Sequence, residues 1–275
     1  MNQSRHHKNA GFVPRTTEAE AGLMKNATRE SVILRSVRAT LTKLKEKNKA
    51  NPRPVVTLAF AQSLDGCITA CKGSSTPISG DQSFLMTHQL RAMHDAILVG
   101  INTVLIDDPQ LTVRYADGTN PIPVVLDSQL RTPPTAKLLH QEERQAIIVT
   151  LQSASKAREA ELVKAGARVI RMPKAAAGGI QLTDLFRWLR EQGVKSLMVE
   201  GGANVICSIL NDRLVDQLVL TIAPRFFGRN GVRAAGTLNC AQAMTGLSNV
   251  EVEQLGDDVL IRGDLACDDT PPADQ

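Results

Sequence analysis

One short stretch of the sequence, Val199-Glu200-Gly201-Gly202-Ala203, combines a carboxylate with two adjacent glycines. The apolar run 196–199 favours a strand before the glycines, and apolar residues at helical spacing over 203–210 favour a helix after them. A helix start offers unpaired N–H groups and a partial positive charge, and glycine lets an anion approach the main chain. These residues suit a phosphate site, although an ordinary tight turn has the same pattern and the G-x-G-x-x-G fingerprint is absent.

Polar side chains follow other predicted strands in the same way. Three of these strands end in hydroxyl, carboxylate or guanidinium groups: 55–61 before Ser63 and Asp65, 123–126 before Asp127 and Ser128, and 111–113 before Arg114. A short helix or turn over 101–106 ends at Asp107-Asp108-Pro109. Because loops at strand ends are where binding groups concentrate, we expect these side chains to contribute to a site.

A helix predicted to start near residue 80 carries further polar groups. Ser79 and Gln82 have the spacing of a capping box at its start. His88 and His94 have no metal-like partner one turn away, so we expect both to be solvated or hydrogen-bonded. Arg91 is a better candidate to bind an anionic group.

The elements that must bring these groups together alternate regularly in the second half of the chain. Strands are predicted over 146–150, 167–171 and 195–199, and helices over 154–165, 182–191 and 203–210. This alternation indicates a parallel sheet with helices on both faces. A strand over 215–222 and a closing hairpin over 250–262 complete the predicted α/β domain.

The composition is that of a globular protein, with 43% hydrophobic and 22% charged residues among 275. No run approaches the roughly 20 apolar residues of a membrane span, and no secretory signal pattern opens the chain. The five cysteines lack C-x-x-C spacing, which argues against a zinc site or a disulfide framework. We therefore expect a cytoplasmic protein with no metal site and no membrane partner.

Positive charge is concentrated at the N-terminus. Residues 1–53 hold twelve Lys or Arg against four Asp or Glu, a net charge of +8, whereas the remainder is net negative. A basic amphipathic helix is predicted over 29–49, before the breaker at Pro52 and Pro54. With only Phe12 to stack on bases, we expect a solvated, partly disordered extension that is dispensable for chemistry, and no nucleic-acid partner. The predicted units are the extension 1–53, a domain over 54–265 and an acidic, disordered tail over 266–275.

Five ordered motifs resemble the riboflavin-biosynthesis reductase family: Ala61-Gln62-Ser63-Leu64-Asp65-Gly66, Ile97-Leu98-Val99-Gly100 with Thr103-Val104-Leu105-Ile106-Asp107-Asp108-Pro109, Leu111-Thr112-Val113-Arg114, Val125-Leu126-Asp127-Ser128, and Val199-Glu200-Gly201-Gly202-Ala203. That family is the reductase half of bacterial riboflavin deaminase-reductases, and it stands alone as the diaminohydroxyphosphoribosylaminopyrimidine reductase of fungi and archaea. The resemblance implies a dihydrofolate-reductase-like α/β sandwich, a homodimer, and NADPH as hydride donor. Pro77 stands where many bacterial members have a tryptophan, and the zinc-deaminase motif is absent, which favours the stand-alone branch.

The resemblance also implies roles for individual residues. It implies NADPH contacts for Ala61, Thr103, Asp107, Ser128 and the turn Gly201, Gly202, Ala203, Asn204, Val205, Ile206, Cys207 and Ser208. It implies substrate contacts for Ser75, Leu111, Arg114 and Glu200, with Arg114 on the 5′-phosphate. Asp107 and Glu200 are the catalytic candidates for proton donation, and Asp65 is a weaker one.

The implied reaction is NADPH-dependent reduction of the ribosyl side chain of 2,5-diamino-6-ribosylamino-4(3H)-pyrimidinone 5′-phosphate to the ribitylamino form. The ribosylamine ring opens to an imine and hydride adds at C1′, which requires two ligands held face to face rather than a metal. Two alternatives stay open. One is action on the deaminated 5-amino-6-(5-phosphoribosylamino)uracil, and the other is a reductase-like binding module without turnover.

Overall fold

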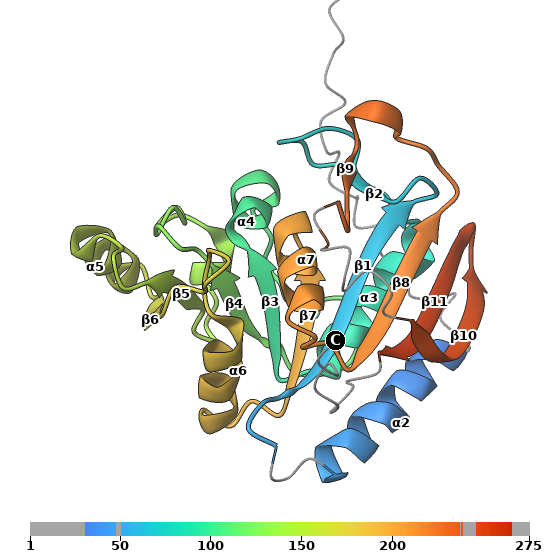
Figure 1. Cartoon of the computed structure of the whole chain (residues 1–275), viewed down its shortest axis with the longest axis horizontal. Coiled ribbons are helices and arrows are strands. Elements are labelled where there is room, and N and C mark those ends of the chain that lie inside the picture. Colours follow the sequence, from blue (N-terminus) through green and yellow to red (C-terminus); the bar gives the residue numbers. More distant parts are fainter. Residues whose placement is uncertain (1–30, 48–50, 237, 239–245, 266–275) are drawn as a thin grey trace, which may run out of the picture.

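The computed structural model describes residues 31–47, 51–236, 238 and 246–265 of the chain. A nine-stranded sheet runs in the order β10-β11-β8-β1-β7-β3-β4-β5-β6 (Figure 1). Its strands are β1 (Val55–Ser63), β3 (Ala96–Gly100), β4 (Ile122–Leu126), β5 (Ile147–Leu151), β6 (Arg168–Met172), β7 (Ser196–Gly201), β8 (Gln217–Ala223), β10 (Leu247–Leu255) and β11 (Asp258–Leu265). Neighbours from β8 to β6 pair in parallel, and the β10–β11 hairpin adds to β8 antiparallel. The predicted mainly parallel sheet is confirmed.

Helices cover both faces of this sheet. Successive residues of a strand point to opposite faces, and because the buried strands are apolar throughout, both faces carry apolar side chains that helices must cover. Leu98 and Val199, paired in register, pack in one core cluster with residues of α6 and α7. Their neighbours Ile97 and Met198, also paired, face the clusters that include residues of α2, α3, α4 and α5. The helices are α2 (Val32–Lys47), α3 (Asp81–Ala92), α4 (Ile101–Asp107), α5 (Lys156–Lys164), α6 (Leu182–Glu191) and α7 (Ala203–Asn211). Figure 1 shows α6 and α7 in front of the sheet and α3 behind it.

The smaller elements lie in the connections. A two-stranded sheet joins β2 (Cys67–Thr69) to β9 (Val232–Arg233), antiparallel. Two short 3₁₀ turns, η1 (Lys137–Leu139) and η2 (Gly228–Asn230), complete the described elements. In the described part of the chain, no helix is both long enough and apolar enough to cross a membrane.

The predicted basic helix is present as α2, but it belongs to the core. Ile33, Leu34, Val37 and Leu41 are at most 3% exposed and share one apolar cluster with β1, α3, β7 and β8. The hydroxyl of Ser31 and the N–H of Ile33 also donate to the Glu253 carboxylate of β10, at 2.5 and 3.0 Å. The expectation of a solvated extension is therefore wrong for this helix, because its apolar stripe packs on the sheet. The predicted disorder of 1–28 and 266–275 lies outside the described residues.

Two local predictions are also wrong. Ser79 does not cap α3; Gly80 is its N-cap without a side-chain cap, and the Gly80 N–H donates to Asp258 at 2.7 Å. The segment 111–114 is not a strand, since Leu111 has φ +57° and no ladder forms there. Its backbone groups bond to side chains instead, as described for the site below.

A chain of buried polar side chains crosses the sheet under α2. Arg262 donates to the Gln217 carbonyl at 3.2 Å, and the Gln217 amide donates to the Thr57 hydroxyl at 2.9 Å. Thr57 and the Leu90 carbonyl each lie 2.7 Å from a ring nitrogen of His94. Because a carbonyl only accepts, the neutral ring donates from Nδ1 to Leu90 and accepts from Thr57 at Nε2. Burial lowers the pKa of His94 to about 4, so the ring is neutral near pH 7.

Candidate active site

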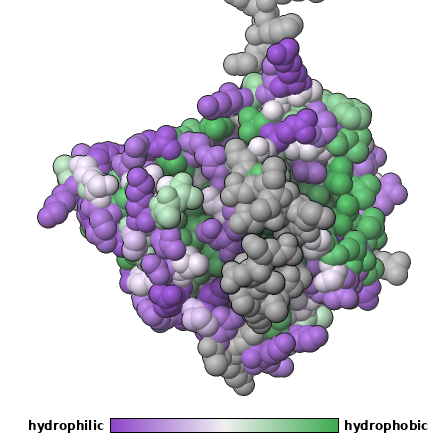
Figure 2. Space-filling model, viewed as in Figure 1, coloured by the Kyte–Doolittle hydropathy of each residue, from purple (hydrophilic) through white to green (hydrophobic). Residues whose placement is uncertain are grey.

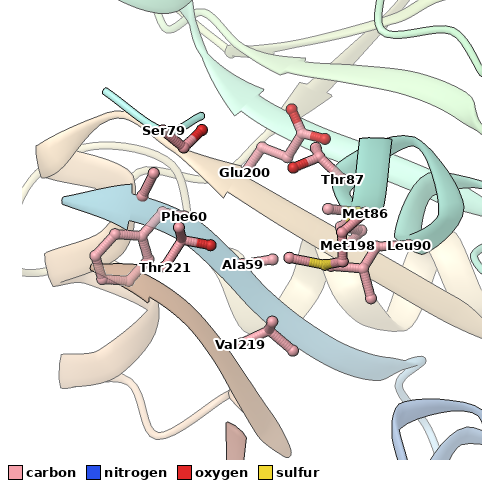
Figure 3. Close-up of a pocket in the computed structure, with 11 residues that line it drawn as sticks. Ala59, Phe60, Ser79, Met86, Thr87, Leu90, Met198, Glu200, Val219 and Thr221 are labelled. Carbon is pink, nitrogen blue, oxygen red and sulfur yellow. The ribbon is translucent and has the colours of Figure 1, made fainter. Parts of the chain in front are cut away.

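A cavity of about 130 Å³ lies between α3 and the strands β1, β7 and β8 (Figure 3). Its apolar wall is built by Ala59, Phe60, Ala61, Met86, Leu90, Met198 and Val219. Polar groups reach it from Ser79, Thr87, Glu200 and Thr221. Figure 3 shows the Glu200 carboxylate and the Thr87 hydroxyl near one another, with the Met198 and Leu90 side chains below them in the view. The pocket therefore combines an apolar wall with one ionisable group.

Glu200 is held by Arg91 of α3. Arg91 donates from Nε and Nη2 to the two carboxylate oxygens at 2.5 and 2.7 Å, and both side chains are largely buried. A third hydrogen bond, 3.1 Å long, runs from Arg91 Nη1 to the Thr112 carbonyl. The anionic group predicted for Arg91 is thus this carboxylate. Each oxygen of Glu200 keeps a lone pair with which to accept a hydrogen bond from a ligand.

The segment 109–121 between α4 and β4 carries two of the predicted substrate contacts. Leu111 is 2% exposed and packs in the core beside β3 and α4, so its substrate contact stays a prediction. Arg114 is exposed, and its Nη1 donates to the Gln110 side chain at 2.6 Å. Arg114 is not among the residues that line the pocket, but Arg91 connects its segment to Glu200 through the Thr112 carbonyl.

Asp107 and Ser75 meet, although 75 lies in the long loop after β2 and 107 ends α4. The Ser75 hydroxyl donates a hydrogen bond to the Asp107 carboxylate, which favours its ionised form. The opposing effect is larger, since partial desolvation raises the pKa of Asp107. Asp107 is itself exposed, but a raised pKa makes its carboxyl group a better proton donor than an aspartate with the ordinary value.

The glycine turn has the geometry expected of a phosphate-binding helix start. Gly201 and Gly202 have φ of +125° and +93°, a region that disfavours side chains. Gly202 is the N-cap of α7 and has no side-chain cap. A β-carbon added to Gly202 would lie 3.6 Å from the Thr103 hydroxyl, so the turn and the start of α4 form one cradle. These residues fit the pyrophosphate of a dinucleotide.

The remaining predicted cofactor contacts are placed less evenly. Val205, Ile206 and Cys207 are buried, and Cys207 donates to the Ala234 carbonyl at 3.5 Å, so their side chains serve packing. Ala203 is half-buried, while Asn204 and Ser208 are exposed on α7. Ala61 lines the pocket, and Ser128 lies half-buried in the turn after β4. Their cofactor roles stay predictions.

Asp65 has a structural role. Its carboxylate accepts from the Ser63 hydroxyl at 2.5 Å and from the N–H groups of Phe227 and Gly228 at 3.1 and 2.7 Å. These hydrogen bonds, the one from Ser63 above all, lower the pKa of Asp65 to about 2. Asp65 therefore remains ionised and clamps the loop after β8, which does not suit a proton donor.

The family model described as the RibD C-terminal domain matches residues 54–261. The chain belongs to this family. Among its relatives, the 2,5-diamino-6-ribosylamino-4(3H)-pyrimidinone 5′-phosphate reductase of Methanothermobacter thermautotrophicus is 38% identical over 215 residues, covering 76% of this chain and 97% of that protein. The riboflavin biosynthesis protein RibD of Aquifex aeolicus is 35% identical over 211 residues, covering 76% of this chain but only 57% of that protein.

Solved structures of the RibD family have the same fold. Acinetobacter baumannii RibD superposes with a TM-score of 0.70 at 26% identity, covering 82% of this chain and 62% of that one. The Saccharomyces riboflavin biosynthesis reductase Rib7 gives a TM-score of 0.64 at 26% identity, covering 82% of this chain and 98% of that one. The resemblance to this family and the α/β fold with a mainly parallel central sheet, both expected from the motifs, are confirmed. α2 lies outside the residues that the family model matches.

The pairing of Arg91 with Glu200 was missed from the sequence. The two residues are 109 positions apart, and neither motif names the other. The only available signal was the place of Arg91 on the polar face of α3. In the described residues, no group of three or more His, Cys, Asp or Glu side chains is placed to hold a metal ion.

Proposed function

We propose that the chain reduces the ribosyl side chain of 2,5-diamino-6-ribosylamino-4(3H)-pyrimidinone 5′-phosphate with NADPH. The observation that carries the proposal is the Arg91–Glu200 pair in a pocket that adjoins the glycine turn, since Glu200 directly precedes Gly201. Family membership and the name of the Methanothermobacter relative, most of whose length this chain covers, support the reductase assignment.

The residues of the site divide the work between two ligands. The Gly201–Gly202 turn and Thr103 would hold the nicotinamide nucleotide, which supplies a hydride when bound. Glu200, fixed by Arg91, accepts hydrogen bonds from N–H groups of the pyrimidine. The exposed guanidinium of Arg114 binds the 5′-phosphate.

Proton transfer falls to Asp107 in this scheme. Its raised pKa suits a group that protonates the ribosyl ring oxygen or the imine nitrogen, whereas both oxygens of Glu200 are engaged by Arg91. Ser75 orients the Asp107 carboxyl group through their hydrogen bond. Positioning and one proton donor suffice for a reaction that needs no protein nucleophile.

The deciding experiment measures NADPH oxidation by the purified protein with each pyrimidine. We expect turnover with the diaminopyrimidinone phosphate and much less with the deaminated uracil compound. Faster turnover of the uracil compound would move the enzyme to the later step of the pathway. If the protein binds NADPH but does not oxidise it in the presence of either pyrimidine, it is instead a binding module.

We also propose a cytoplasmic homodimer, joined through the uncovered face of the antiparallel end of the sheet. Val250, Val252 and Val259 are 53%, 66% and 38% exposed there. Val252 pairs with Ile261, which pairs with Leu220 of β8, so an apolar row crosses three strands. Figure 2 shows hydrophobic residues gathered at the right, where Figure 1 places these strands. Light scattering of the protein and of Val252→Glu tests this arrangement: the wild type is expected to be dimeric and the variant monomeric.

A further inference from the structure

The segment 109–121 has no ladder or helix, so its backbone polar groups must find partners elsewhere. Side chains supply them. The Thr112 carbonyl accepts from Arg91 at 3.1 Å, and the N–H of Val113 donates to Asn120 at 2.8 Å. The N–H of Arg114 donates to Nδ1 of His88 at 3.2 Å. Two of these three partners lie one turn apart on α3.

His88 is wholly buried beneath this segment. Its ring packs edge to face against Phe84 and Tyr115, each with a centroid separation of 4.9 Å. Burial, aided by the nearby charges of Arg91 and Arg114, lowers the pKa of His88 to about 3. The ring is therefore neutral near pH 7, which leaves Nδ1 free to accept from Arg114 and puts the hydrogen on Nε2.

Packing alone does not explain a histidine here. Nε2 of His88 is buried and has no hydrogen-bond partner among the described residues. A leucine of similar volume would fill the same space without leaving a buried N–H unpaired. What leucine would lack is the acceptor for the Arg114 N–H.

We propose that His88 is a positioning residue for the reductase, which fixes the backbone of Arg114 so that its guanidinium meets the phosphate of the substrate. The inference rests on the proposed function, in which Arg114 binds that phosphate. Together with Arg91, which holds Thr112 and Glu200, His88 makes one face of α3 the frame for both ends of the pyrimidine substrate.

A double-mutant cycle tests whether His88 acts through Arg114. Loss of one neutral hydrogen bond in His88→Leu should raise KM for the phosphorylated pyrimidine about 2- to 10-fold, with KM for NADPH unchanged. In an Arg114→Ala background, the same change should have less than about a 2-fold effect. His88→Asn, which keeps a side-chain acceptor, should recover part of the loss. Multiplying losses in the double variant would overturn the proposal.

Two controls separate positioning from packing and from the proposed function. Phe84→Leu disturbs the same aromatic cluster without removing the acceptor, so a KM increase as large as that of His88→Leu would also contradict the proposal. Amide hydrogen exchange at Arg114 needs no substrate, and it should quicken in His88→Leu but not in Phe84→Leu. A wild type that reduces neither pyrimidine, although exchange at Arg114 quickens in His88→Leu alone, would refute the proposed function and still support the His88–Arg114 hydrogen bond. Unchanged exchange at Arg114 in His88→Leu would contradict the hydrogen bond and, with it, the proposal.

Discussion

Arg91 and Glu200 face one another across 109 residues of sequence with two hydrogen bonds between them, of 2.5 and 2.7 Å. The same guanidinium holds the Thr112 carbonyl. One side chain of α3 therefore fixes the carboxylate at the end of β7 and the segment that carries Arg114. Changes to Arg91 should be felt at both places.

Arg91→Lys keeps the charge but loses the two-pronged geometry. We expect kcat/KM for the pyrimidine to fall roughly 10- to 150-fold, because a charge-assisted hydrogen bond contributes about 1.5–3 kcal/mol. The chain offers a matched control, because Arg53 makes the same two-bond contact to Asp216, at 2.7 and 2.9 Å. These two residues lie just before the starts of β1 and β8, whereas Glu200 lies near the end of β7. Arg53→Lys should lower the melting temperature and leave kcat/KM unchanged. Equal kinetic effects in the two variants would rule out a special role for Arg91.

Gly202→Asp should abolish tight NADPH binding, since it puts a negative charge at the start of α7. At φ +93° any side chain is strained, so Gly202→Asn serves as the comparison with nearly the same shape and no charge. Fluorescence titration with NADPH should give a dissociation constant about tenfold or more higher for the aspartate than for the asparagine variant, corresponding to roughly 1.4 kcal/mol. Equal constants would mean that no phosphate lies at this turn.

A protein that begins at Asn51 lacks α2 and should be unstable. Four side chains of α2 are at most 3% exposed, and each contributes roughly 1.5–3 kcal/mol by burial, a total comparable with the stability of a whole domain. A protein that begins at Ser31 keeps those contacts and should melt close to the full-length chain. Calorimetry of the two proteins decides the matter, and equal melting temperatures would restore the idea of a dispensable extension.

Stability should fall as the pH drops below about 6.5, the ordinary value of a histidine in the unfolded chain. The pKa of His94 is about 4 in the folded state, so between these values the unfolded chain binds more protons. The loss amounts to at most about 1.4 kcal/mol per pH unit from His94, and His88 acts in the same direction. Urea unfolding at pH 7 and pH 5 should show a smaller difference for His94→Asn than for the wild type. His140→Asn, at an exposed position, should behave like the wild type.

Arg114→Ala should lower kcat/KM for the phosphorylated substrate about 10- to 150-fold, the effect expected when a charge-assisted contact is lost. For a substrate without its phosphate, kcat/KM should be nearly the same in the variant and the wild type. Steady-state kinetics on both substrates tests the role. The phosphate assignment is wrong if the two lose activity to the same extent, because Arg114 would then act only on its protein neighbours.

Much of the fold could be predicted because its signals are local. The strand-turn-helix around Gly201 and Gly202 is present, with both glycines at positive φ, and α4 ends at Asp107 as expected. Alternating apolar strands and amphipathic helices gave the parallel sheet. In each case, neighbouring residues carry the information.

What could not be predicted depends on distant partners. Leu111-Thr112-Val113 has the composition of a strand, but Leu111 has φ +57°, and the backbone of Thr112 and Arg114 bonds to side chains of α3 instead of to a neighbouring strand. The apolar stripe of α2 predicted a helix, but it did not predict that this stripe packs on the sheet. Arg91 and Glu200 belong to separate motifs, and only the fold brings them together.

The buried chain from Arg262 to His94 has a fixed direction. A guanidinium can only donate and the Leu90 carbonyl can only accept, so the orientation of each group between them is set by the two ends. Replacing Gln217 alone would leave the Thr57 hydroxyl without the donor it now has, whereas Arg262 would keep its hydrogen bonds to Thr40 and Asp264. Over evolutionary time, we expect positions 57, 94, 217 and 262 to be inherited as a set, and a descendant that loses one to have changed the others with it.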